Sequence, residues 1–173
     1  MIKTRKRKTA PKKKRQTSCK KNSRRSLPKR LRRPGWRKSS REAAKAASKT
    51  SEGKILCCIC GKDLTGQPVH IEHHQPYSQT REKYGNTPEV FNTGGPMALA
   101  CPHCNLTRTH KTPVKECVLR NRAFRDRIKT STGWKTPKIR KFLNNYHHLD
   151  KINVGKEVSY EGIENAVRKS IQF

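Results

Sequence analysis

Two Cys-x2-Cys pairs constrain the fold of this chain more than any other feature of its sequence. Cys57 and Cys60 form the first pair, and Cys101 and Cys104 form the second, with 40 residues between the pairs. Four thiolates at this spacing are typical ligands of one tetrahedral zinc ion, and they leave no open coordination position. We therefore expect a structural Zn²⁺ that joins two distant segments and whose binding free energy supports the fold.

The other three cysteines leave one alternative open at this zinc site. Cys58 offers a Cys-x-Cys pair with Cys60 in place of Cys57, although the two-residue spacing is the usual one. We expect Cys19 and Cys117 to take no part in metal binding. Seven cysteines, four of them at zinc-ligand spacing, indicate an intracellular, reducing compartment and not a secreted, disulfide-bonded framework.

Positive charge is concentrated near the N-terminus. The formal net charge is +30, and residues 1–50 hold 22 of the 42 Lys and Arg residues but one acid, Glu42. With so little to bury, residues 1–50 are expected to form a disordered arm that orders on a polyanion, so DNA or RNA is the expected partner. The expected phosphate contacts are Lys12, Lys13, Lys14, Arg15, Arg24, Arg25, Arg32 and Arg33 in the arm, and Lys111 further on.

Other kinds of partner are disfavoured. No apolar run approaches the roughly 18–20 residues of a membrane-spanning helix, and there is no secretory apolar region. We therefore expect no membrane association, no secretion and no small-molecule substrate.

The apolar pattern predicts an α+β fold. Residues 51–112 are expected to form a small zinc-stapled domain, and residues 113–173 a helical extension. Short strands are expected at Ile55–Leu56, Val69–Ile71 and Met97–Ala100, with a loop from Gln75 to Pro96. Helices are expected over 39–49, from Pro102 to about His110, from Thr112 to Gly133, from Thr136 to Leu149, and from Tyr160 to Ile171.

A set of polar side chains lies between and after the cysteine pairs. Glu72 and His73 directly follow an expected strand, and Asn105 directly follows the last cysteine. Carboxylate and amide oxygens suit a hard ion such as Mg²⁺ or Mn²⁺ and not zinc. An imidazole beside such an ion can act as a general base at neutral pH.

The order of these motifs resembles the HNH endonuclease family. The first cysteine pair is followed by Glu-His-x-x-Pro at Glu72 to Pro76, by Gly94-Gly95, and by Leu-x-Cys-x2-Cys-Asn-x-x-Arg ending at Arg108. The match covers residues 55–111, about a third of the chain. It implies a ββα-metal core in which Glu72 and Asn105 bind the catalytic Mg²⁺ or Mn²⁺ and His73 is the general base. Arg108 matches the basic residue that follows Asn105, and with Lys111 it is expected to neutralise the scissile phosphate.

Two positions depart from the family pattern. Glu72 stands where Asp is usual, and Pro96 stands where the family has its central Asn. We expect Asn92 to supply the loop-bracing hydrogen bond instead. The imidazoles of His74, His103 and His110 are expected to support the site or contact phosphates, with His110 a competitor of Asn105 as ligand.

The resemblance implies metal-dependent hydrolysis of nucleic-acid phosphodiester bonds, with DNA favoured and RNA also open. The products would carry 5′-phosphate and 3′-hydroxyl ends. The alternative is a non-catalytic, RNA-binding component of a large ribonucleoprotein built on an HNH-like zinc module. Trp36 fits either role, because its ring can stack on a base or pack on the domain.

Overall fold

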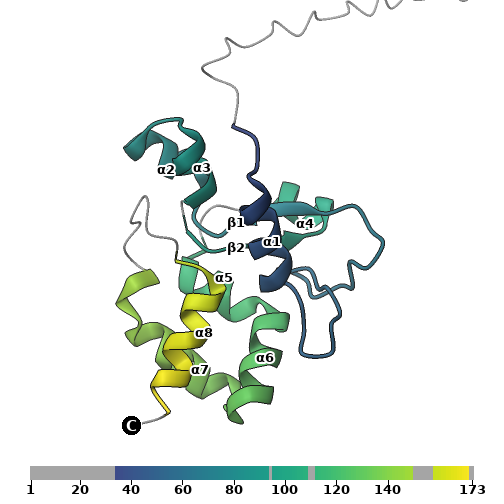
Figure 1. Cartoon of the computed structure of the whole chain (residues 1–173), viewed down its shortest axis with the longest axis vertical. Coiled ribbons are helices and arrows are strands. Elements are labelled where there is room, and N and C mark those ends of the chain that lie inside the picture. Colours follow the sequence, from purple (N-terminus) through teal and green to yellow (C-terminus); the bar gives the residue numbers. More distant parts are fainter. Residues whose placement is uncertain (1–33, 94, 109–111, 150–157, 172–173) are drawn as a thin grey trace, which may run out of the picture.

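The computed structural model describes residues 34–93, 95–108, 112–149 and 158–171 (Figure 1). A two-stranded antiparallel sheet joins β1 (His70–His73) to β2 (Met97–Ala100). Helices surround this sheet, and α4 (Pro102–Thr107) follows β2 directly. The described chain is therefore a mixed α and β fold with a small sheet, as the sequence predicts.

The strand pairing sets the position of the polar motif. Glu72 lies opposite Ala98 and His73 opposite Met97, and the carbonyl of Pro96 accepts a further hydrogen bond from the backbone N–H of His74 at 3.0 Å. All four residues of β2 are buried, whereas β1 begins at the surface. The pairing thus places Glu72 and His73 at the end of β1, opposite the start of β2.

The predicted strand at Ile55–Leu56 is reduced to two isolated bridges. Ile55 pairs with Lys49, and Leu56 pairs with Asp63. These bridges hold the turn that carries the first cysteine pair.

Helix α1 (Lys38–Ala47) belongs to the folded domain. Ala44 and Ala47 are completely or almost completely buried against β2, where their small side chains allow the helix to approach the sheet closely. Just after the helix, the hydroxyl of Ser48 accepts a hydrogen bond from the N–H of Leu99 at 2.7 Å. The disordered arm expected over residues 1–50 therefore does not include residues 34–50.

The loop expected from Gln75 to Pro96 instead contains two short helices. These are α2 (Tyr77–Tyr84) and α3 (Pro88–Thr93), which pack together through Tyr77, Val90 and Phe91. Pro76 precedes α2, and Pro88 begins α3 at a position where a helix needs no N–H donor. Helices of 8 and 6 residues are too short to display a helical period, so their prolines suggested a loop.

The helix expected from Thr112 to Gly133 is two helices, α5 (Val114–Arg120) and α6 (Arg122–Thr132). Asn121 separates them. Its side-chain oxygen accepts from the backbone N–H groups of Ala123 and Phe124, and its Nδ2 donates to the carbonyl of Ala47 at 2.9 Å. This buried amide both caps α6 and ties it to the end of α1.

The C-terminal helices share one core with the region of the cysteine cluster. Helix α7 (Thr136–Asn145) is followed by a 3-10 turn (His147–Leu149), and α8 (Tyr160–Lys169) begins at the Ser159 cap. Phe124, Ile128, Ile139, Leu143, Ile163 and Val167 are all at most 1% exposed and belong to the same cluster as Cys57, Ala44 and β2. The described helices after residue 112 thus contribute to this common core.

Several predicted residues lie outside the described ranges. They are Lys12, Lys13, Lys14, Arg15, Cys19, Arg24, Arg25, Arg32, Arg33, Gly94, His110 and Lys111. Within the described part of the chain, none of the helices has the length and apolar character required to cross a bilayer.

Candidate functional site

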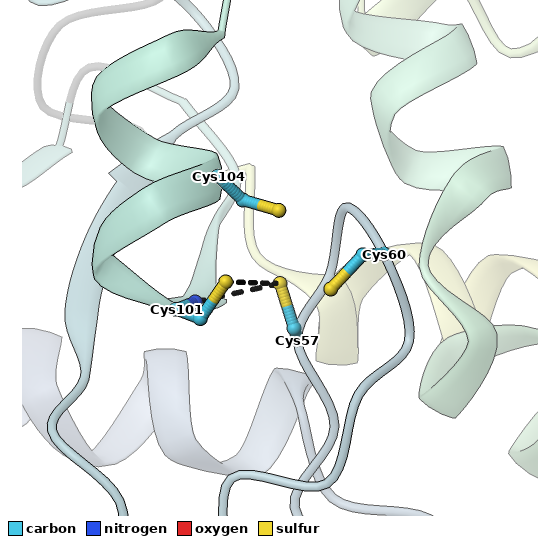
Figure 2. Close-up of side chains that lie close together, drawn as sticks. All are labelled: Cys57, Cys60, Cys101 and Cys104. Carbon is cyan, nitrogen blue, oxygen red and sulfur yellow. Dashed lines mark hydrogen bonds between the residues drawn. The ribbon is translucent and has the colours of Figure 1, made fainter.

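The four predicted zinc ligands converge on one point (Figure 2). The Sγ atoms of Cys57, Cys60, Cys101 and Cys104 all lie within 4.8 Å of one another, and those of Cys57 and Cys101 are 3.9 Å apart. Zn–S bonds of about 2.3 Å in a tetrahedron place sulfurs about 3.8 Å apart. The cluster can therefore hold a metal ion and is compatible with structural zinc.

Local backbone structure builds this cluster. Cys101 precedes the first turn of α4 and Cys104 lies in that turn, while Cys57 and Cys60 lie in a tight turn closed by a hydrogen bond from Gly61 N–H to the carbonyl of Cys57. Burial raises the pKa of the Cys57 thiol, but hydrogen bonds from backbone amides, including that of Cys101, more than offset it and lower the pKa to about 7. Such amides favour the thiolate that a metal requires.

Cys58 does not take part in the cluster. Its side chain is 2% exposed, packs in the core, and has a raised pKa chiefly because of burial. The structure thus selects Cys57, and not Cys58, as the partner of Cys60.

Glu72 and Arg108 form a nearly buried ion pair at the end of β1. Nη1 of Arg108 meets Oε1 of Glu72, and the two side chains are 9% and 10% exposed. The same guanidinium donates to the carbonyls of His73 and His74 at 3.0 Å each, and to Sγ of Cys117 at 2.7 Å. Arg108 therefore holds both the carboxylate and the backbone of the motif.

The ring of His73 is fixed by aromatic packing and by one backbone contact. Its Nε2 lies 2.7 Å from the carbonyl oxygen of Phe91. The indole of Trp36 stacks on the imidazole with ring centroids 4.6 Å apart, and Phe91 and Tyr77 complete the surroundings. Trp36 thus packs on the domain beside the predicted base.

The side chain of Asn92 joins α3 to the segment that precedes α1, close to His73. Its Oδ1 accepts from the N–H of Arg37 at 2.8 Å, and its Nδ2 donates to the carbonyls of Pro88 at 2.7 Å and Gly35 at 3.3 Å. The side chain is 2% exposed. This amide holds the segment that carries Trp36 against α3, and so helps to position the ring stacked on His73.

Asn105 lies one residue beyond the zinc-cluster cysteine on α4, where it lines the same groove as Glu72, His73 and Arg108. The groove has a volume of about 990 Å³. Within the described ranges, the four cysteines are the one group of three or more His, Cys, Asp or Glu side chains close enough together to hold an ion. The hard-ion pair of Glu72 and Asn105 therefore stays a prediction.

His74 has a structural environment and does not reach solvent. The ring is 1% exposed, and its Nε2 lies 2.6 Å from Oη of Tyr160 on α8. Burial, with a smaller effect from the neighbouring His73, lowers the pKa of His74 to about 3. The ring is therefore neutral at pH 7 and cannot contact a phosphate, while His103 lies exposed on α4.

Two groove residues were absent from the sequence-based site. Arg41 and Lys45 of α1 line the groove with Glu72 and His73. Their spacing of four residues within the helix expected over 39–49 is a readable signal, because such residues share a face. The composition of residues 1–50 favours a disordered arm, which gives no reason to place them near the motif.

Comparisons of the chain with protein-family models, with curated proteins and with solved structures each gave no match. The chemistry of the site is therefore argued from its own residues.

Proposed function

We propose that this chain is a metal-dependent endonuclease of the HNH kind that hydrolyses nucleic-acid phosphodiester bonds, preferentially in DNA. One observation carries the proposal. His73, held by the Phe91 carbonyl, lies next to Glu72 in a groove that Asn105 also lines, and two cysteines of the cluster flank the first turn of the helix that carries Asn105. The net charge of +30 favours a polyanionic substrate.

The contact with Phe91 assigns the nitrogens of His73. A carbonyl oxygen only accepts, so in the neutral ring Nε2 carries the proton and donates it. The lone pair then lies on Nδ1, which becomes the basic nitrogen. In the proposed reaction His73 takes a proton from water, whose oxygen bonds to phosphorus as the bond to the 3′ oxygen breaks.

Glu72 and Asn105 would hold the divalent ion. Both line the groove, and both provide the hard oxygen donors that such an ion prefers. Bound there, Mg²⁺ or Mn²⁺ would stabilise the negative charge that develops on the phosphoryl group and the leaving oxygen.

We assign Arg108 a positioning role. Its guanidinium contacts Glu72, two backbone carbonyls and Cys117, so its donors are directed into the protein. Holding the carboxylate and the end of β1 in place supports catalysis without contact to the substrate. Contact with the phosphate is the role that the sequence predicts for Arg108. With Arg108 directed into the protein, other side chains must make that contact.

The same ion pair favours the second candidate, a non-catalytic RNA-binding module. If Glu72 serves only to neutralise the buried Arg108, no ion is needed and the fold acts as a scaffold. The two candidates differ in one measurable property, cleavage.

The test uses the full, zinc-loaded chain with duplex DNA and with structured RNA, with and without added Mg²⁺ or Mn²⁺. Chelators are avoided because they also remove zinc. His73→Ala should lower turnover about 10²–10⁴-fold, the usual contribution of a general base. The matched control is His147→Ala, an exposed imidazole on the 3-10 turn after α7 that should retain activity. If the wild-type protein binds both substrates but cuts neither, the endonuclease proposal is wrong and the non-catalytic RNA-binding module takes its place.

A further inference from the structure

Arg41 and Lys45 line the groove, and neither forms an ion pair with an acid of the described residues. They lie one turn apart on α1, and both side chains are exposed. The acid within α1, Glu42, pairs with Lys38 at 3.9 Å. The carboxylate that lines the groove, Glu72, is held by Arg108. An anionic ligand in the groove would therefore meet two unneutralised cations.

The same groove exposes apolar side chains. Three large hydrophobic residues of the described chain are exposed, and two of them line this groove, Leu106 at 78% and Val69 at 41%. Leu106 is on α4, next to Asn105. A surface that combines cations with apolar side chains matches a nucleic-acid strand, which alternates phosphates with apolar sugar and base faces.

We propose that Arg41 and Lys45 form the phosphate-binding wall of the groove, and that Leu106 contacts the sugar or base faces of the same bound strand. This rests on the proposed function in that it assigns the groove to nucleic acid. The rise of an α-helix separates Arg41 and Lys45 by about 6 Å along α1, which allows each to take its own phosphate. The wall supplies the phosphate contacts that the inward-directed Arg108 does not make.

The wall is tested by the salt dependence of binding to a labelled duplex, with no Mg²⁺ or Mn²⁺ added. Each lost phosphate contact should reduce the slope of log K against log salt by about 0.9. Arg41→Ala/Lys45→Ala should therefore flatten the slope by about 1.8 relative to wild type. Arg168→Ala/Lys169→Ala, which removes the same charge from the exposed end of α8, should leave it unchanged.

Leu106→Ala separates the apolar contact from the charge. It should weaken binding severalfold and leave the salt slope unchanged, because no phosphate contact is lost. An unaltered affinity would remove Leu106 from the interface.

Two results would show that Arg41 and Lys45 are not the phosphate-binding wall. One is a salt slope of Arg41→Ala/Lys45→Ala equal to that of the wild type, and the other is an equal flattening of the slope in the α8 control. The proposal would also be overturned if Arg41→Ala/Lys45→Ala lost binding to phosphatidylserine vesicles but bound DNA as the wild type does, because the surface would then bind a membrane. Cleavage is scored separately in Mg²⁺. If the salt slope flattens in Arg41→Ala/Lys45→Ala but the wild type does not cleave DNA, the proposed nuclease activity is wrong and the phosphate-binding wall stands. If the wild type cleaves DNA but the slope of the variant is unchanged, the nuclease activity stands and the wall is wrong.

Discussion

Asn92→Ala should destabilise the region that holds His73. The substitution removes three hydrogen bonds, at 2.7, 2.8 and 3.3 Å, from a side chain that is 2% exposed. At about 0.5–1.5 kcal/mol each, their loss should cost about 1.5–4.5 kcal/mol. The cost falls on the contact between the Trp36 segment and α3, because Asn92 joins Gly35 and Arg37 to Pro88.

Two measurements check this expectation. Urea denaturation of the zinc-loaded protein gives the change in global stability, and hydrogen exchange at the Arg37 amide reports local opening of the segment. We expect protection of that amide to fall at least about tenfold, which corresponds to about 1.4 kcal/mol. Asn145→Ala, at an exposed position on α7, is the control and should stay within about 0.5 kcal/mol of wild type. If Asn92→Ala matches this control in both assays, the bracing role assigned to Asn92 is wrong.

Three further perturbations test other parts of the structure. Wild-type protein should contain one zinc per chain by elemental analysis, and Cys104→Ser should lose the metal and unfold the central domain; a folded, zinc-free wild type would contradict this. The ring nitrogen shifts of His74 should stay constant from pH 8 to 5.5, because its folded pKa is about 3. The unfolded ring binds a proton near its ordinary pKa of 6.5, whereas the folded ring stays neutral until a pH of about 3. The contribution of His74 to the free energy of unfolding therefore decreases as the pH falls from 6.5 toward 3. A titration midpoint of the His74 ring near pH 6.5 in the folded protein would refute its burial. Phe124→Ala, at a fully buried position, should cost about 3–5 kcal/mol in chemical denaturation, and a cost under 1 kcal/mol would show that α6 is not part of the core.

The metal cluster was predictable because its signal is local. The spacing pairs Cys101 with Cys104 and favours Cys57 over Cys58 as the partner of Cys60, and soft thiolates in this pattern have few other uses. The strand at Met97–Ala100 and the helix after Cys101 were predictable for a similar reason, since a short apolar run and a proline mark them directly.

The remaining features depend on partners that are distant in sequence. Asn121 ends α5 and begins α6 because its amide reaches Ala47, 74 residues earlier, and no periodicity within the helices reports that contact. The inward direction of Arg108 follows from Glu72 and Cys117, although its sequence position suggested a contact with phosphate. Lys45 joins the groove only because α1 packs on β2.

Hydrolysis in ¹⁸O-labelled water tests the central claim most directly. The zinc-loaded wild type is incubated with duplex DNA and Mg²⁺, and the new ends are analysed by mass spectrometry. We predict 5′-phosphate ends that carry one ¹⁸O and unlabelled 3′-hydroxyl ends, because His73 activates water to attack phosphorus and the 3′ oxygen departs. Formation of these products should fall about 10²–10⁴-fold in His73→Ala. Absence of labelled product, or equal yields from wild type and His73→Ala, would contradict a nuclease built on His73.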